Sequence, residues 1–203
     1  MNRLEHLKKK LRRGTVYRRA DLTQLSKSID RHLAELLEGE TLQKVSRGLY
    51  YFPEQSNFGP VPPDERNLIR GFLKGERFLI TSPNAYNSLG VGTTQLYNVK
   101  IVYNHKRHGE IKLGNRSFLF QLKHHFPKKI TPEFLLVDLV NNIDKLAEDH
   151  SEILGKAFSK AQQLNANELK KAVADYGNTK TKNCWLLYSI HQHLLKLDLT
   201  SAV

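Results

Sequence analysis

Apolar residues recur at helical spacing from the start of the chain. Leu4, Leu7 and Leu11 lie three or four residues apart between cationic positions, and Gly14 can end this first helix. A second, short helix is predicted over residues 20–25, with an acidic residue in its first turn. The pattern therefore predicts two helices before residue 26.

A third helix follows and is the best candidate for reading DNA. It begins near Ser26 or Ser28, since either side chain can cap a helix N-terminus. Its apolar stripe is formed by Ile29, Leu33, Leu36 and Leu37. At about 100° per residue, Lys27 and Arg31 fall on the opposite side of the helix from this stripe. Both cations are therefore expected to face outwards.

Two β-prone segments come next and complete a familiar order of elements. Residues 42–45 and 49–52 are predicted strands, joined by a tight turn at Ser46-Arg47-Gly48 with Arg47 at its tip. Three helices followed by a two-stranded ribbon are typical of a winged helix-turn-helix, which places one helix in a DNA major groove. We predict such a domain over residues 1–54.

Proline and glycine cluster over residues 55–63, which we predict to be a linker. Residues 64–203 then form the second domain, in which strands precede helices. Strands are predicted at 78–81, 99–103, 110–113 and 116–122, and helices at 64–74, 83–89, 132–147, 151–164, 166–176 and 179–197. The fold class is therefore α+β: a winged helix-turn-helix, then a mixed domain ending in a helical third.

The net charge is +12, and half of it lies in the first quarter of the chain. Residues 1–53 hold twelve Lys and Arg against six Asp and Glu. The candidate DNA-binding cations are Arg18, Arg19, Lys27, Arg31, Lys44 and Arg47. Such a surface suits a polyanion, although charge does not separate DNA from RNA or a membrane surface, and a basic face can also serve protein contacts.

Compartment and redox state follow from what the sequence lacks. No apolar run approaches the length of a membrane span, and residues 1–10 do not resemble a signal peptide. A single cysteine, Cys184, excludes an intrachain disulfide and a multi-cysteine zinc site, and we expect it to be a small core residue. We therefore expect a cytoplasmic protein without a membrane partner.

Candidate chemical motifs are weak, so we expect no enzyme activity, no cofactor and no metal. The glycines of residues 89–94 lack the spacing of a nucleotide-binding loop. His191 and His193 point about 200° apart on a helix and cannot share one ion. Lys180 and Lys182 could attract an anion to a helix start, but an ordinary connection with solubilising lysines is the favoured interpretation.

Four segments resemble one known family, the AbiE-type antitoxins. The resemblance lies in Thr41 to Pro53, in Phe58 to Pro63, in Asn84 to Gly90 with Thr94-Gln95, and in Tyr176 to Lys182. Their order covers nearly the whole chain. The resemblance implies a winged helix that represses its own operon and a second domain that counteracts a nucleotidyltransferase-like toxin encoded beside it. In that family, a type IV system, a stable complex with the toxin is not required.

By the same resemblance, the DNA role falls on Ser26, Lys27, Ser28 and Arg31 in the third helix, with Lys44 and Arg47 in the wing. The expected partners are double-stranded DNA of its own operator and, functionally, the toxin. Two alternatives stay open. A ligand-responsive regulator would use the second domain to bind a small effector. A nucleic-acid-processing enzyme would use the winged helix only for docking.

Overall fold

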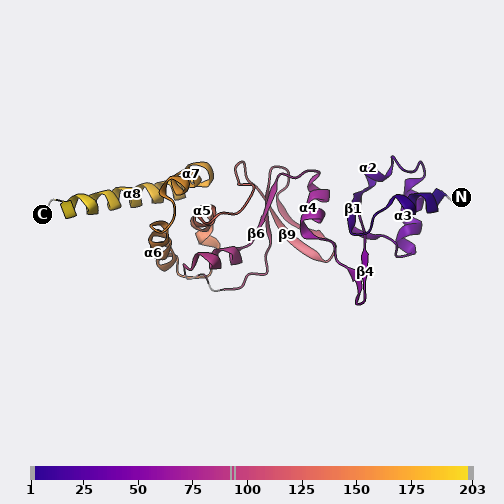
Figure 1. The fold of residues 1–203 in the computed structure, drawn as a ribbon, viewed down its shortest axis with the longest axis horizontal. Helices are drawn as coiled ribbons and strands as arrows, with labels where there is room; N and C mark the ends of the chain where they lie inside the picture. Colours follow the sequence, from indigo (N-terminus) through magenta and orange to yellow (C-terminus); the bar gives the residue numbers. More distant parts are fainter. Residues whose placement is uncertain (1–2, 92, 94, 201–203) are drawn as a thin grey trace. The chain divides into compact units, whose positions relative to one another are not determined.

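The computed structural model of the protein describes residues 3–91, 93 and 95–200, with side chains described as far as Ile190. Contacts divide the chain into two compact units. Unit 1 comprises Met1–Phe78 and Lys106–Leu122, and unit 2 comprises Leu79–His105 and Lys123–Val203. This division differs from the predicted boundary at 55–63, because later strands return to the first unit. Figure 1 traces the elements of both units along the chain.

Unit 1 begins with three helices and a small sheet whose order along the chain matches the sequence prediction. In chain order these are α1 (Arg3–Lys10), β1 (Thr15–Arg18), α2 (Arg19–Leu22), α3 (Ile29–Glu38), β2 (Gln43–Ser46) and β3 (Leu49–Phe52). The strands form an antiparallel sheet in the order β1-β3-β2. The shared core is formed by Leu7, Leu11, Leu22, Ile29, Leu33, Leu36, Leu42 and Tyr50.

α2 is shorter than predicted, whereas α3 begins at one of its two predicted starts. The shorter helix ends at Leu22, and the Thr23 hydroxyl donates to the Ala20 carbonyl in the following turn. α3 begins at Ile29 with Ser28 in the N-cap position, so Ser26 and Lys27 precede the helix. The Ser28 amide donates to the Ser26 hydroxyl at 3.2 Å and holds a non-helical turn there. The predicted apolar stripe of α3 is otherwise correct, with only Leu37 half-buried.

The predicted linker is a hairpin. β4 (Glu54–Ser56) pairs with β5 (Gly59–Val61), and the Tyr51 hydroxyl donates to the Val61 carbonyl at 2.9 Å. Gly59 has a φ of +104°, which a glycine adopts without strain. Glycine and proline here therefore belong to a β-hairpin. Both of its strands are edge strands, in which a proline is tolerated. Most residues of the predicted linker therefore form regular secondary structure.

Unit 1 is completed by a helix and a further hairpin. α4 (Glu65–Leu73) is capped by Asp64, whose carboxylate accepts from the Asn67 amide at 2.9 Å. It packs on β1, with Gly71 facing Val16. β8 (Gly109–Leu113) and β9 (Arg116–Leu122) are antiparallel neighbours.

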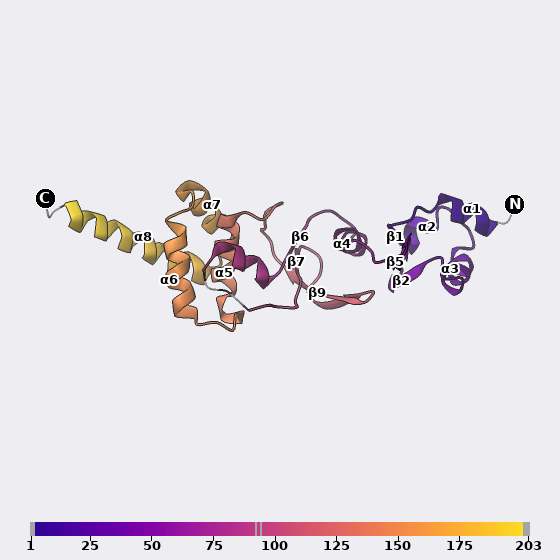
Figure 2. The same ribbon diagram turned by 60° about the horizontal axis from the view of Figure 1, so that its bottom comes forward.

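Unit 2 is mainly helical and is organised around one central helix. α5 (Pro132–Asn142) contacts α6 (His150–Ala161), α7 (Ala166–Tyr176), α8 (Thr179–Thr200) and the 3-10 helix η1 (Pro83–Leu89). Residues 133–140 of α5 are all buried, and they include the charged residues Glu133 and Asp138. Figure 2 shows α5 among the other helices of this unit. β6 (Phe78–Thr81) and β7 (Ile101–Asn104) are neighbouring strands. The predicted helix 132–147 is interrupted at Asn142, where the 3-10 helix η2 (Ile143–Lys145) follows.

The fold class is α+β, as predicted. Strands and helices occur in both units, and the longest run of helices is at the C-terminal end. Within the residues described, none of the helices combines the length and the apolar character needed to cross a membrane.

The packing of α4 on the sheet generates a prediction about two glycines. An added Cβ at Gly71 would lie 2.9 Å from Val16 Cγ1 and 3.2 Å from Leu49 Cδ1. We expect Gly71→Ala to lower the free energy of unfolding by about 1–3 kcal/mol through overpacking. Gly155 in α6 has open space at the same atom, so Gly155→Ala should raise it by about 0.5–1 kcal/mol. Urea denaturation of both variants checks this, and equal effects would contradict it.

Candidate nucleic-acid interface

The cations of the first three helices and the β1-β3-β2 sheet divide into two groups. Two arginines are held by carboxylates through paired hydrogen bonds. Arg18 donates to Asp21 from Nε at 2.8 Å and from Nη2 at 2.9 Å. Arg19 donates to Asp30 from Nε at 2.6 Å and from Nη2 at 2.5 Å. These guanidinium groups already bind an anion from the same chain.

This pairing weighs against the prediction for Arg18 and Arg19, which were expected to meet a phosphate at the start of α2. That helix has four residues and offers little dipole, and both arginines have their donors turned to carboxylates. The Arg19 guanidinium, mainly by its hydrogen bond, lowers the pKa of Asp30, and Asp30 in turn raises the pKa of Arg19. Both groups therefore stay charged near neutral pH, and their charges cancel at the surface.

The second group is exposed and, within the described part of the chain, forms no ion pair. It consists of Arg3, Lys9, Lys10, Arg12, Arg13, Lys27, Lys44 and Arg47. Five of these lie on or just after α1, one precedes α3, and two belong to the β2-β3 hairpin. Exposed cations without a partner are the residues that can exchange solvent counterions for phosphates.

The outward face of α3 is not uniformly basic. Its positive charges lie at the N-terminal end and its negative charges toward the C-terminal end. Lys27 and Arg31 lie at its N-terminal end, and both are exposed as predicted. Arg31 has an exposed ion pair with Glu35 at 3.4 Å, and Glu38 is the last residue of the helix. The acidic residue of the first turn, Asp30, is neutralised by Arg19. An anion would therefore be attracted to the N-terminal end of α3 and repelled from its C-terminal end.

The turn that carries Arg47 is anchored on both sides. The carbonyl of Val45, at a β-bulge between Lys44 and Ser46, accepts from the Gly114 amide at 2.6 Å. The carbonyl of Gly48 accepts from the Arg19 amide at 2.9 Å. The turn, predicted correctly from the sequence, thus holds Arg47 on a fixed backbone.

A surface hollow of about 470 Å³ lies beside the start of α3. It is lined by Arg3, His6, Leu25, Ser26, Lys27 and Ser28. The Ser26 hydroxyl lies 2.9 Å from Nδ1 of the buried His32, so its hydrogen bonds go to the turn itself. Ser28 is the N-cap residue of α3, yet its side chain makes no capping hydrogen bond. Arg3 and His6 were not among the predicted site residues, because residues more than twenty positions apart meet here.

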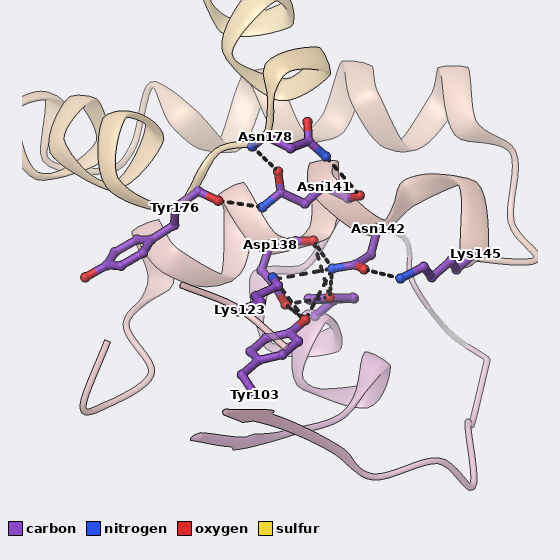
Figure 3. A network of polar contacts seen from close by, with 9 residues as sticks. Tyr103, Lys123, Asp138, Asn141, Asn142, Lys145, Tyr176 and Asn178 are labelled. Carbon is purple, nitrogen blue, oxygen red and sulfur yellow. Dashed lines mark hydrogen bonds and ion pairs between the residues drawn. The ribbon is translucent and has the colours of Figure 1, made fainter. Parts of the chain in front are cut away.

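Unit 2 contains a second polar constellation, centred on the fully buried Asp138 of α5 (Figure 3). Its carboxylate accepts from the Tyr103 hydroxyl at 3.0 and 2.9 Å and from the Tyr86 hydroxyl at 2.9 Å. Lys123 Nζ lies 2.7 Å from Asp138 Oδ1, and Asn142 Nδ2 donates to the same oxygen at 3.3 Å. Four side chains from separate segments thus converge on one carboxylate.

In this arrangement, hydrogen-bond donors occupy all the acceptor sites of the Asp138 carboxylate. Burial first, and then the charge of Asp138, raises the pKa of both Tyr86 and Tyr103, so the two hydroxyls stay protonated donors. A carboxylate has about four lone-pair sites, and the four donors occupy them. The sequence analysis missed this network. Its one signal was a charged residue, Asp138, inside an apolar helical run, where a charge must find partners.

With this geometry in place, the chain can be compared with known proteins. Residues 3–173 match the model described as "Family of unknown function (DUF6088)". The chain belongs to the DUF6088 family. The fold is similar to the crystal structure of the RV2827C protein from Mycobacterium tuberculosis, with a TM-score of 0.53 and 14% identity, over 88% of this chain and 71% of that one. No curated protein matches the sequence.

In this DUF6088 protein, the lysines predicted as a possible anion surface at the start of α8 differ from each other. Lys180 Nζ is held by Asp144 at 2.8 and 2.9 Å, which lowers the pKa of that carboxyl through the hydrogen bond. Lys182 is exposed. Asn141 of α5 binds the Tyr176 carbonyl and the Asn178 amide, so this segment is tied to the core of unit 2. The geometry favours the interpretation of an ordinary connection.

Other predicted positions are resolved only in part. Gly92 and Thr94 of the glycine-containing loop lie outside the described residues, as do the side chains of His191 and His193. Within the described ranges no three His, Cys, Asp or Glu side chains are arranged to hold a metal ion. Cys184 is half-buried rather than a core residue, and burial raises the pKa of its thiol.

The two lysine–aspartate pairs of unit 2 generate a prediction. Lys123→Met would leave the fully buried Asp138 without its cation and should lower the free energy of unfolding by about 3 kcal/mol, at the low end for a broken buried pair because the ammonium group reaches solvent. Lys180→Met removes an exposed pair of similar geometry and should change stability little. Thermal and urea unfolding of both variants provide the measurement. A larger loss for Lys180→Met would exclude the anchoring role of Asp138.

Proposed function

We propose that residues 3–52 form a winged helix-turn-helix that binds double-stranded DNA, and that the protein represses its own operon and acts as an antitoxin. The observation that carries the DNA-binding part is the sorting of charges in unit 1. In the described part of the chain, eight exposed cations without ion pairs lie on or just after α1, before α3 and on the β2-β3 hairpin, while the acid at the start of α3 is neutralised by Arg19.

The polarity of α3 supports a particular orientation on DNA. In a helix-turn-helix, the N-terminal residues of the second helix contact base edges in the major groove. Lys27 and Arg31 occupy that end, and Glu38 occupies the far end. The first turn of α3 therefore enters the groove, with Arg31 as the candidate for a base contact. Lys44 and Arg47 bind the neighbouring backbone, where contacts fix register rather than sequence.

The antitoxin part of the proposal is supported by the resemblance of four segments to the AbiE-type antitoxins. Under this proposal the partner is a nucleotidyltransferase-like toxin encoded beside the gene, and unit 2 opposes its effect. Repression and neutralisation would then be carried by different residues, which makes the two activities separable by substitution.

DNA binding is tested with the region upstream of the gene, a shuffled sequence and a salt series. We expect preferential binding of the upstream region, with a salt slope reporting several phosphate contacts. Arg31→Ala should cost about 1–3 kcal/mol of binding free energy at the upstream site if Arg31 contacts a base, and much less on the shuffled sequence. Arg47→Ala should weaken both alike and reduce the slope by about 1. Lys170→Ala on α7 is the control and should bind as the wild type does.

A wild-type protein that binds both duplexes equally and loses them at physiological salt would contradict a repressor role. Equal binding by Arg31→Ala and wild type would contradict the placement of α3 in the major groove. The β2-β3 hairpin could still contact a phosphate.

The division of activities is tested in cells that express the neighbouring gene product. The double variant Lys44→Ala with Arg47→Ala should lose repression of a reporter under the upstream region but still rescue growth, because unit 2 is unchanged. Reporter activity and viable counts are the measurements. Loss of rescue by a variant that is still folded would show that neutralisation also requires the hairpin.

A further inference from the structure

The hollow beside the start of α3 has the composition of an anion site. Three of its six lining residues, Arg3, His6 and Lys27, can carry positive charge, and none of the six is acidic. Other cations of this region behave differently. Lys8 pairs with Glu5 at 3.3 Å, and Arg19 pairs with Asp30. In the described chain, the side chains of these three residues form neither ion pairs nor hydrogen bonds.

The uncharged residues of the hollow supply further donors. Ser28 precedes α3, and its hydroxyl is not used for capping, so the first amides of this ten-residue helix lack a side-chain acceptor. The Ser26 hydroxyl is engaged by His32 and by the Ser28 amide and does not compete. Asp30 is turned to Arg19 and adds no net negative charge to the helix start. The lining of this hollow is complementary to an acceptor with negative charge.

Exposure restricts what that acceptor can be. Arg3, His6 and Lys27 all have exposed side chains, so the hollow is open to solvent and suits one group of a larger anion. Lys27 also lies directly before the helix turn that, in the proposed function, enters the major groove. A backbone phosphate flanking that groove would meet it there.

We infer that this hollow binds one backbone phosphate of the DNA, held jointly by Arg3 and Lys27, with His6 and the Ser28 hydroxyl as additional donors. This inference rests on the proposed function and adds the N-terminal end of α1 to the interface. The shared phosphate fixes the position of α1 relative to the DNA strand that borders the major groove.

The experiment is a double-mutant cycle in the full-length protein with the upstream duplex, using Arg3→Gln, Lys27→Gln and the combination. Each single variant should weaken binding, and the combined loss should be smaller than the product of the single losses, because both cations hold one phosphate. The salt slope of the double variant should be smaller than that of the wild type by about 0.9, the value for one phosphate. Lys170→Gln with Lys171→Gln removes the same charge from exposed positions on α7 and should leave the slope unchanged.

The outcomes separate this inference from the proposed function. If the wild type binds no duplex, the proposed function fails and the inference falls with it. If the wild type binds and the Arg3→Gln and Lys27→Gln variants match the α7 control, the phosphate site alone is overturned. Losses that multiply would place the two cations on separate phosphates and would also overturn it. Circular dichroism and the melting temperature verify that each variant is folded.

Inorganic phosphate distinguishes the two sources of the anion. Calorimetric titration of the wild type with phosphate alone, at ionic strength matched with chloride, should give no saturable heat if the hollow requires the DNA backbone. Saturable binding that the double variant loses, together with unchanged DNA affinity, would assign the hollow to free phosphate and overturn the DNA contact.

Discussion

The stability of unit 2 depends on hydrogen-bond partners for a carboxylate buried in its central helix. Asp138 has no exposed surface, and its donors come from η1, from β7, from the residue after β9 and from the end of α5. A charge left without partners there would cost several kcal/mol. The position of Asp138 therefore dictates where Tyr86, Tyr103 and Lys123 must lie, and these positions orient the strand and the 3-10 helix against α5.

In unit 1 the corresponding constraint is how charges are divided between internal pairs and solvent. Arg18 and Arg19 bind carboxylates of the same chain, whereas Lys27, Lys44 and Arg47 face solvent. A count of cations in the sequence cannot distinguish the two paired arginines from the three cations that face solvent. The pairs are individually weak, because they are exposed, yet they decide which part of the surface attracts a polyanion.

Periodicity predicted most of the helices and strands, because an amphipathic stripe such as Ile29, Leu33 and Leu36 records which face is buried. It placed Lys27 and Arg31 outside correctly for the same reason. It left the start of α3 open between Ser26 and Ser28, where local hydrogen bonds decide, and it did not indicate that glycine and proline form the hairpin of β4 and β5. Contacts between distant segments have no local signature, so the Asp138 network and the hollow lined by both Arg3 and Lys27 required the structure.

The two anchoring hydrogen bonds of the β2-β3 turn have a consequence for the entropy of recognition. A free loop must be ordered when it meets its partner, at about 1–2 kcal/mol for each backbone residue that is fixed. Here the Gly114 and Arg19 amides already hold the carbonyls on either side of Arg47. That ordering is completed during folding, so a partner that contacts Arg47 has only the rotamers of its side chain left to restrict. The turn is thus a pre-organised element, and its contribution to affinity comes from conformational freedom lost before any encounter.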